Sequence, residues 1–359
     1  MIKMCFRIIF ATILSTSLIG CGAVKALHAH SDVHDAKEGK PGNDVTVPND
    51  SDDWFLLDMS QKYGLMAVFA LTAYRLDMDV SDRDQFACDY LKPTYAGDRN
   101  FGMPRHAASE SRAEFWERWV PRETRVGDEP PCVNDLSDGL FYETYVRRNA
   151  DGKILAFVIA YRGTENRKGQ WAIDWRSNLS NVFGFEPAAY ANARGRLEGL
   201  VKLMRIEGPS ARIYAVGHSL GGGLAQQAGY MSDEVFEVYA FNTSPVTNWT
   251  NLRLQGKVKK GYPIIHRVSN GGEALTSVRF LTASATGTSH GRHDTQIQFG
   301  PKALIKGHSM GLLTCNFAKI LSDNKSESAH HLYPPSYINE YVLRPDGDKT
   351  PGKRVCDDV

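Results

Sequence analysis

The sequence has no strong excess of charge of either sign. Its 359 residues include 42 lysines and arginines against 41 aspartates and glutamates, which excludes the basic surface of a typical nucleic-acid-binding protein. None of its six cysteines forms a C-x-x-C pair, the spacing typical of zinc and dithiol redox sites. With 42% hydrophobic residues the chain is typical of a globular protein, and we expect it to use neither a metal nor another cofactor.

The N-terminus lacks an apolar run long enough to cross a membrane. Its apolar stretch, residues 8–19, has about twelve residues, whereas a membrane-spanning helix needs about twenty. Lys3 and Arg7 flank the start of this stretch, an arrangement typical of a secretory signal peptide. We therefore predict that residues 1–20 are an export signal.

The predicted signal is followed directly by a cysteine. Leu-Ile-Gly-Cys at residues 18–21 resembles a bacterial lipobox. That resemblance implies that the Cys21 thiol is acylated and becomes the new N-terminus, and Gly22, in place of aspartate, implies sorting to the outer membrane. Because the nearly neutral chain has no polybasic patch, membrane attachment would rest on the acyl chains. A plain signal peptide with an incidental cysteine is the alternative.

The segment after the predicted anchor, residues 22–53, has few large apolar side chains and neither a helical nor a strand period. Such a segment cannot bury enough surface to fold alone, so we expect residues 21–53 to be a lipidated cysteine and a flexible tether. We assign the histidines of this segment to a solvated linker and not to a metal cluster. The remainder, 54–359, is predicted to form one domain.

Periodicity predicts the elements of this domain. Apolar positions at intervals of three and four predict a helix over 54–76, and the polar residues 77–139 are interpreted as an insertion or cap with one helix around 107–120. Strands are predicted over 140–147, 153–161, 212–216, 235–241 and 264–268, and further helices over 188–206 and 220–231. The alternation of strands and helices indicates an α/β fold with a mostly parallel, doubly wound sheet flanked by helices.

Gly217-His218-Ser219-Leu220-Gly221 lies between a predicted strand and a predicted helix. In that context G-x-S-x-G is typical of a nucleophile elbow, a strained turn that exposes the serine hydroxyl above the sheet. Ser219 is therefore the predicted nucleophile. The helix N-terminus presents unpaired N–H groups to developing negative charge, so the N–H of Leu220 is a predicted oxyanion donor. A purely structural glycine-rich turn is the alternative.

A second motif, Tyr161-Arg162-Gly163-Thr164, ends the predicted strand beside the elbow. Together with Gly-His-Ser-Leu-Gly-Gly it resembles the class 3 lipases, the fungal-lipase-like branch of the α/β hydrolases, over roughly residues 140–315. The resemblance implies an α/β-hydrolase fold and assigns the other oxyanion N–H to Thr164. It also implies a lid within residues 165–185, although core packing explains the apolar residues there equally well: Trp171, Ile173, Trp175, Phe183 and Phe185.

The nucleophile needs a base, and the base needs an orienting acid; in α/β hydrolases they follow in the order Ser, acid, His. Glu273, after the strand 264–268, is the predicted acid, although the family usually has aspartate there, and Asp294 is the alternative acid. His308, in Lys-Gly-His-Ser-Met, matches the histidine-bearing segment of the family and is the predicted base.

Other histidines are weighed against His308. His290 and His293 also follow the predicted acid and stay open on chain order alone. His266 precedes it, and we expect a strand residue with a satisfied hydrogen bond. His218 is next to the nucleophile, where the direction of the main chain should point its ring away from the serine Oγ.

Four cysteines remain once Cys5 and Cys21 are set aside: Cys88, Cys132, Cys315 and Cys356. In an exported chain an even number suggests disulfides, here two bridges in one of three connectivities, with free buried thiols as the alternative. A bridge between Cys315 and Cys356 would pin the loop that carries His308.

These predictions combine into an exported, lipid-anchored serine ester hydrolase. It would release fatty acids from lipid esters through an acyl-enzyme, as a triacylglycerol lipase or carboxylesterase does. A phospholipase A1 acting on membrane phospholipids uses the same groups and is the first alternative. The second is a non-catalytic envelope lipoprotein that retains the fold. The expected partners are a lipid or ester substrate and the membrane, with no nucleic acid.

Overall fold

The computed structural model describes part of the chain. The described residues are 45–47, 53–75, 80–92, 115–122, 127–163, 187–246, 249–260, 263–273, 275, 292–299 and 306–323. Their elements, with η for 3-10 helices, are β1 (Val45–Val47), α2 (Asp53–Thr72), α3 (Val80–Phe86), η1 (Asp89–Leu91), β2 (Phe115–Arg118), β3 (Cys132–Asp135), β4 (Leu140–Arg148), β5 (Ile154–Tyr161), α5 (Ala188–Glu207), β6 (Arg212–His218), α6 (Leu220–Met231), β7 (Val235–Phe241), α7 (Trp249–Leu254), β8 (Ile264–Asn270), β9 (Arg292–Ile297), η4 (Lys306–His308) and α9 (Met310–Asp323).

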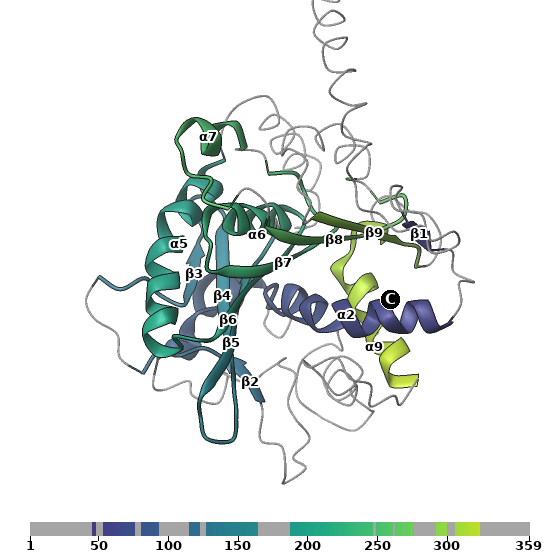
Figure 1. Cartoon of the computed structure of the whole chain (residues 1–359), viewed down its shortest axis with the longest axis horizontal. Helices are drawn as coiled ribbons and strands as arrows, with labels where there is room; N and C mark the ends of the chain where they lie inside the picture. Colours follow the sequence, from purple (N-terminus) through teal and green to yellow (C-terminus); the bar gives the residue numbers. More distant parts are fainter. Residues whose placement is uncertain are drawn as a thin grey trace, which may run out of the picture.

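The described strands form a single sheet in the order β1-β9-β8-β7-β6-β5-β4-β2, with β3 also paired to β4 (Figure 1). From β1 to β5 in this order all neighbours are parallel, whereas β4 runs antiparallel to β5, β2 and β3. β2 and β3 share one edge of β4, because β3 pairs with its first half and β2 with its second. A mixed α/β fold with a mostly parallel sheet is thereby confirmed.

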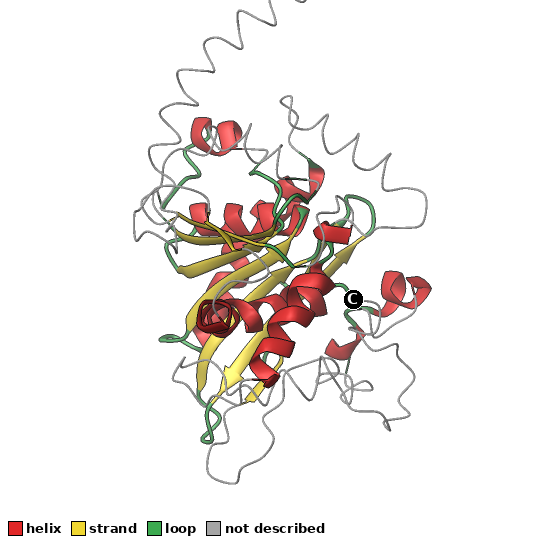
Figure 2. Cartoon of the chain, turned by 90° about the vertical axis from the view of Figure 1, so that its right-hand side faces the viewer, coloured by secondary structure: helices red, strands yellow, loops and turns green. Residues whose placement is uncertain are grey.

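Helices cover both faces of this sheet (Figures 1 and 2). α2 and α9 pack against each other on one face, and α5 and α6 cover the other. Successive residues of β5 accordingly belong to two different hydrophobic cores: Ala156, Val158 and Ala160 to the core under α2 and α9, and Phe157, Ile159 and Tyr161 to the core under α5 and α6. The continuous apolar run of β5 follows from this two-sided burial.

The predicted elements of the domain core are present with ends that differ by about one helical turn at most. Four strands of the sheet, β1, β2, β3 and β9, are not among the predicted strands. β9 reads Arg-His-Asp-Thr-Gln-Ile, and its four central residues are only half-buried. Its sequence shows no apolar alternation, because only the two end residues, Arg292 and Ile297, are buried and only Ile297 belongs to the hydrophobic core.

The predicted helix around 107–120 is wrong where it is described, because Phe115–Arg118 is the strand β2. Phe115, Trp116, Trp119 and Val120 are spaced as in a helical stripe, but the tertiary context overrides that pattern. β2 pairs with residues 145–148, and Trp116 and Trp119 are buried in the two different cores. The segment 77–139 is therefore more than a cap, since it contributes β2 and β3 to the sheet and large side chains to its cores.

The predicted tether also contributes to the sheet. Val45–Val47 forms the short strand β1, which pairs in parallel with residues 295–297 of β9. The expectation of a segment without strands is wrong at these three residues. The rest of the predicted tether, the export signal and Cys21 lie outside the described residues.

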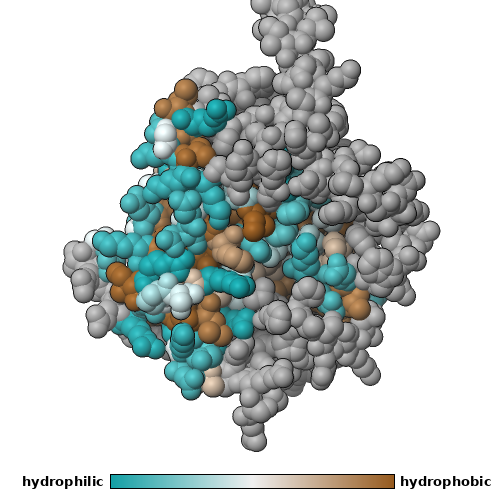
Figure 3. Space-filling view, in the orientation of Figure 1, coloured by the Kyte–Doolittle hydropathy of each residue, from teal (hydrophilic) through white to brown (hydrophobic). Residues whose placement is uncertain are grey.

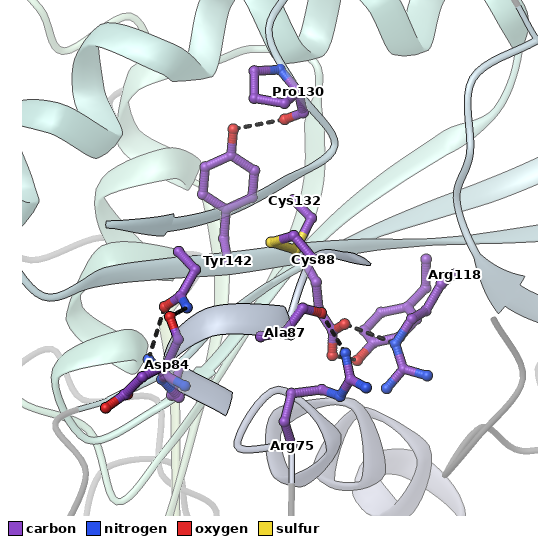
Figure 4. Close-up of a disulfide and its surroundings, with 12 residues drawn as sticks. Arg75, Asp84, Ala87, Cys88, Arg118, Pro130, Cys132 and Tyr142 are labelled. Carbon is purple, nitrogen blue, oxygen red and sulfur yellow. Dashed lines mark hydrogen bonds and ion pairs between the residues drawn. A yellow bond between two sulfur atoms is a disulfide. The ribbon is translucent and has the colours of Figure 1, made fainter. Parts of the chain in front are cut away.

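A disulfide between Cys88 and Cys132 joins the segment around η1 to the strand β3, with the two Cα atoms 5.6 Å apart (Figure 4). Cys132 in turn lies opposite Glu143 of β4. This bridge is one of the connectivities that the sequence allows. Cys315, on α9, is disulfide-bonded as well, and Cys356, its predicted partner, lies outside the described residues.

The described surface is mainly hydrophilic in the view of Figure 3, with apolar residues scattered over it, some of them near α7. Among the described residues, Leu254 at the end of α7 is the most exposed large apolar side chain, at 81%. None of the described helices has the length and apolar character needed to span a bilayer.

Candidate active site

Ser219 lies in a sharp turn between β6 and α6, where the elbow motif predicts it. Its φ of 57° is in a region that L-residues rarely adopt, so the turn is strained. Backbone hydrogen bonds join this turn to the end of β7 and the residues after it: the Ser219 N–H donates to Phe241 O, and the Ser244 N–H donates to Ser219 O, both at 3.0 Å. A Cβ atom on Gly217 would overlap the carbonyl group of Gly221, which explains why the motif requires glycine there.

The structure brings Ser219, His308 and Glu273 into one chain of hydrogen bonds. The Ser219 hydroxyl lies 3.0 Å from Nε2 of His308, and Nδ1 of His308 lies 2.6 Å from Oε2 of Glu273. The serine follows β6, the glutamate follows β8, and the histidine ends η4, so the chain lies at the carboxyl edge of the parallel strands. With Nδ1–H donating to the carboxylate, Nε2 is free to accept the serine proton.

The hydrogen-bonded residues Glu273 and His308 differ in how deeply their side chains are buried. The side chain of Glu273 is fully buried, whereas that of His308 is 18% exposed. The cost of burying the carboxylate is offset by hydrogen bonds, because its Oε2 accepts the N–H of Leu275 at 2.9 Å as well as the bond from His308. A buried carboxylate with two donors is held in one orientation, and the partly exposed ring can exchange protons with a bound molecule or water.

His218, next to the nucleophile, contacts the backbone of the predicted base. Its Nε2 lies 2.7 Å from the carbonyl oxygen of His308, and its Nδ1 lies 2.7 Å from the hydroxyl of Tyr74. Since a carbonyl only accepts, Nε2 carries the proton and Nδ1 accepts the Tyr74 O–H. The end of α2 thereby supports the turn of His308 through His218.

Asp294, the alternative acid, is engaged elsewhere. It lies on β9, opposite Arg267 of β8, and its carboxylate forms an ion pair with that arginine. Nε of a second arginine, Arg292, lies 3.7 Å from Oδ2 of Asp294. Glu273, and not Asp294, occupies the Nδ1 side of the His308 ring.

Of the other candidate histidines, His266 and His293 are described, and they lie on the neighbouring strands β8 and β9. His293 stacks on His266, with ring centroids 5.2 Å apart, and His290 lies outside the described residues. His266 is a strand residue, as expected, but its Nδ1 has no hydrogen-bond partner among the described residues. Burial lowers the pKa of His266 below its ordinary value, and the carboxylate of Glu237 opposes that shift.

Of the two predicted oxyanion donors, Leu220 is the first residue of α6, so its N–H belongs to the helix N-terminus directly after the nucleophile. Thr164 and the predicted lid residues 165–185 lie outside the described part of the chain. Gly163 is described, and a Cβ on it would lie 3.0 Å from Cβ of Ser219. The strand end that precedes Thr164 therefore approaches the nucleophile closely.

Two buried asparagines next to the site were not singled out in the sequence. Asn242 follows β7 and Asn270 ends β8, and neither side chain is exposed. Their positions at the ends of predicted strands are the sequence feature that could have pointed to a place near the site. Within the described ranges, no group of three or more His, Cys, Asp or Glu residues could hold a metal ion.

Among solved structures the chain is similar to lipase II from Rhizopus niveus (17% identity, TM-score 0.28), to the extracellular lipase LipA from Serratia marcescens (14%, 0.27) and to esterase B from Lactobacillus rhamnosis in complex with a tributyrin phosphonate (12%, 0.32). The matches cover 42, 62 and 82% of this chain. The chain spans 60% of the Rhizopus lipase, 40% of the Serratia lipase and all of the esterase.

No curated protein matches the chain. A family model does: that of the Tle-like phospholipase domain, described as phospholipase-like, matches residues 124–311, just over half of the chain. This range contains Ser219, Glu273 and His308. The chain belongs to the family of Tle-like phospholipase domains.

Proposed function

We propose that the protein is a serine hydrolase of lipid esters with an α/β-hydrolase fold of the class 3 lipase type. The observation that carries the proposal is the unbroken chain from Ser219 Oγ through the His308 ring to the buried Glu273 carboxylate. Nucleophile, base and orienting acid are the three roles that acyl transfer to serine needs. The non-catalytic alternative gives no reason for a strained serine aligned with a histidine that is itself aligned with a buried acid.

In the proposed mechanism, Ser219 Oγ attacks the acyl carbonyl carbon while Nε2 of His308 takes the hydroxyl proton. The resulting imidazolium is stabilised by Glu273, which accepts the hydrogen bond from Nδ1–H throughout. The Leu220 N–H and Thr164 stabilise the oxyanion of the tetrahedral intermediate. His308 then returns the proton to the leaving alcohol, and a water molecule releases the fatty acid from the acyl-enzyme by the same steps.

The family match supports lipid esters as the substrate class. Triacylglycerols, simple carboxylic esters and phospholipids all present the ester that this mechanism cleaves. The match to a phospholipase-like domain favours the phospholipid, so phospholipase A1 activity, with release of the acyl group at the first glycerol position, is the form to test first.

We further propose that residues 1–20 are an export signal and that Cys21 is acylated, which would anchor the enzyme to the cell envelope, in the outer membrane. A membrane-bound enzyme would meet its lipid substrate at the surface where that substrate lies. Metabolic labelling with a palmitate analogue that Cys21→Ser does not abolish would contradict the anchor.

The test of the hydrolase is labelling with a fluorophosphonate probe, followed by a panel of phospholipid, triglyceride and short p-nitrophenyl ester substrates. Ser219→Ala should abolish labelling and lower hydrolysis by at least about 1,000-fold, with little change in the melting temperature. Ser232→Ala, at the other end of the same helix α6, is the matched control and should keep both. Equal labelling or hydrolysis by Ser219→Ala would disprove the proposal.

A further inference from the structure

Asn242 lies directly after β7 with a backbone that few residues accept. Its φ is 39°, in the left-handed region, and the residue has no exposed surface. Asparagine tolerates this conformation better than most residues other than glycine. Its own N–H donates to the carbonyl oxygen of Val268 at 2.8 Å, which fixes the residue between β7 and β8.

The side chain of Asn242 joins two different loops. Its Nδ2 donates to the carbonyl oxygen of Gly307 at 3.2 Å, and its Oδ1 accepts the N–H of Asn270 at 2.8 Å. Gly307 immediately precedes His308, and Asn270 opens the loop that leads to Glu273. A single amide group therefore connects the segment of the base with the segment of the acid.

The loop that carries His308 packs tightly against the loop that leads to Glu273. A Cβ on Gly307 would lie 3.0 Å from Nδ2 of Asn270 and 3.4 Å from Cβ of Glu273. Asn270 is itself anchored, because its Oδ1 accepts the N–H of Phe299 at 2.8 Å. The contact between the loops thus depends on where Asn242 holds the backbone of each.

The turn of His308 is consequently held at two successive carbonyl groups. Asn242 binds the carbonyl oxygen of Gly307, and His218 binds that of His308 at 2.7 Å. The peptide that carries the His308 side chain lies between these two contacts. A hydrogen bond of 2.6 Å between His308 and Glu273 requires this backbone to be fixed within a few tenths of an ångström.

We propose that Asn242 is a positioning residue that sets the distance between Glu273 and His308. The inference rests on the proposed hydrolase function, in which this pair orients the base. Asparagine suits the role because one short planar group supplies both a donor and an acceptor at a left-handed residue. Glycine would keep the backbone and lose both bonds, and aspartate would keep the acceptor and lose the donor.

The experiment compares the full-length protein with Asn242→Gly and Asn242→Asp. In Asn242→Gly, kcat for a short p-nitrophenyl ester should fall about 10- to 100-fold while KM changes less than threefold, because a displaced base slows the chemistry and leaves substrate binding intact. The low-field proton resonance of His308 Nδ1–H should shift upfield or disappear. Asn242→Asp, which retains only the contact to Asn270, should resemble the glycine variant.

Gln227→Ala is the matched control. Gln227 is also a buried amide that donates to a backbone carbonyl, that of Tyr190 at 3.0 Å, but it lies on α6 facing α5. Its loss should lower the melting temperature and leave both kcat and the His308 resonance unchanged. If folded Asn242→Gly keeps kcat within twofold and an unshifted His308 resonance, the positioning role is wrong. Because the resonance needs no turnover, it tests this role even if Ser219 proves inactive.

Discussion

Two glutamates with almost no exposure, Glu273 and Glu143, are the buried acids of two different regions. Glu273 faces His308 at the carboxyl edge of the sheet. Glu143, on β4, accepts Nε–H of Arg118 at 2.8 Å and the hydroxyl of Tyr145 as well. The disulfide partner Cys132 lies opposite Glu143 in the sheet, and Figure 4 shows Arg118 beside the bridge.

The partners explain the different roles of the two acids. Arg118 is fully buried, always protonated and has no proton to transfer at any pH that the protein meets. The side chain of His308 is partly exposed, and its imidazole ring can accept a proton and return it during a reaction. In our proposal the buried carboxylate of Glu273 orients a base, whereas that of Glu143 neutralises a permanent cation. Substitutions at Glu273 should therefore lower activity, whereas substitutions at Glu143 should lower the free energy of unfolding.

The largest expected effect separates the two candidate acids of the site. Glu273→Ala should lower kcat/KM for a short ester by about 1,000- to 10,000-fold, since the imidazolium would lose its counter-charge and its orientation. Asp294→Ala, which removes a partner of Arg267, should cost less than about tenfold. Steady-state kinetics on both variants measures this difference. A greater loss in Asp294→Ala would transfer the orienting role to that residue.

A smaller effect, on stability alone, is expected for the second region. Glu143→Ala leaves the charge of Arg118 buried without its carboxylate and should lower the free energy of unfolding by about 3–5 kcal/mol in urea denaturation. The activity of the protein that remains folded should be retained. The double variant Arg118→Met with Glu143→Leu should recover most of the stability, because it buries no charge. A loss of kcat in folded Glu143→Ala would erase the distinction between the two acids.

The smallest effect concerns His266, which has no catalytic partner. Its pKa lies below the ordinary value of 6.5 because of burial, with Lys62 adding to the shift and Glu237 opposing it. Below about pH 6.5 the unfolded chain therefore binds a proton that the folded chain does not, and stability falls as the pH falls. His266→Phe keeps a ring between Tyr239 and His293 and should show a weaker loss of unfolding free energy from pH 7 to 5. Equal losses would contradict a neutral buried His266.

Prediction from sequence succeeded where local pattern and burial agree. The run of β5 and the helix–strand alternation around it are local features, and both are present. β2 and β9 were missed because their partners, residues 145–148 of β4 and β8, determine them more than their own periodicity does. The elbow is recognisable because its strained turn demands glycines at fixed offsets from Ser219.

The sequence by itself determined the α/β class, the elbow and the order of Ser219, Glu273 and His308, since these depend on short-range patterns. Only the tertiary structure decided which acid faces the histidine, because Asp294 and Glu273 both follow β8 along the chain. It also decided the contacts of Tyr74, His218 and Asn242, whose hydrogen bonds join residues that are 144, 90 and 65 positions apart in the sequence, respectively. Such contacts form only when the ends of β6, β7, β8 and α2 lie close together at the carboxyl edge of the sheet. No local sequence pattern predicts which distant segments come together in this way.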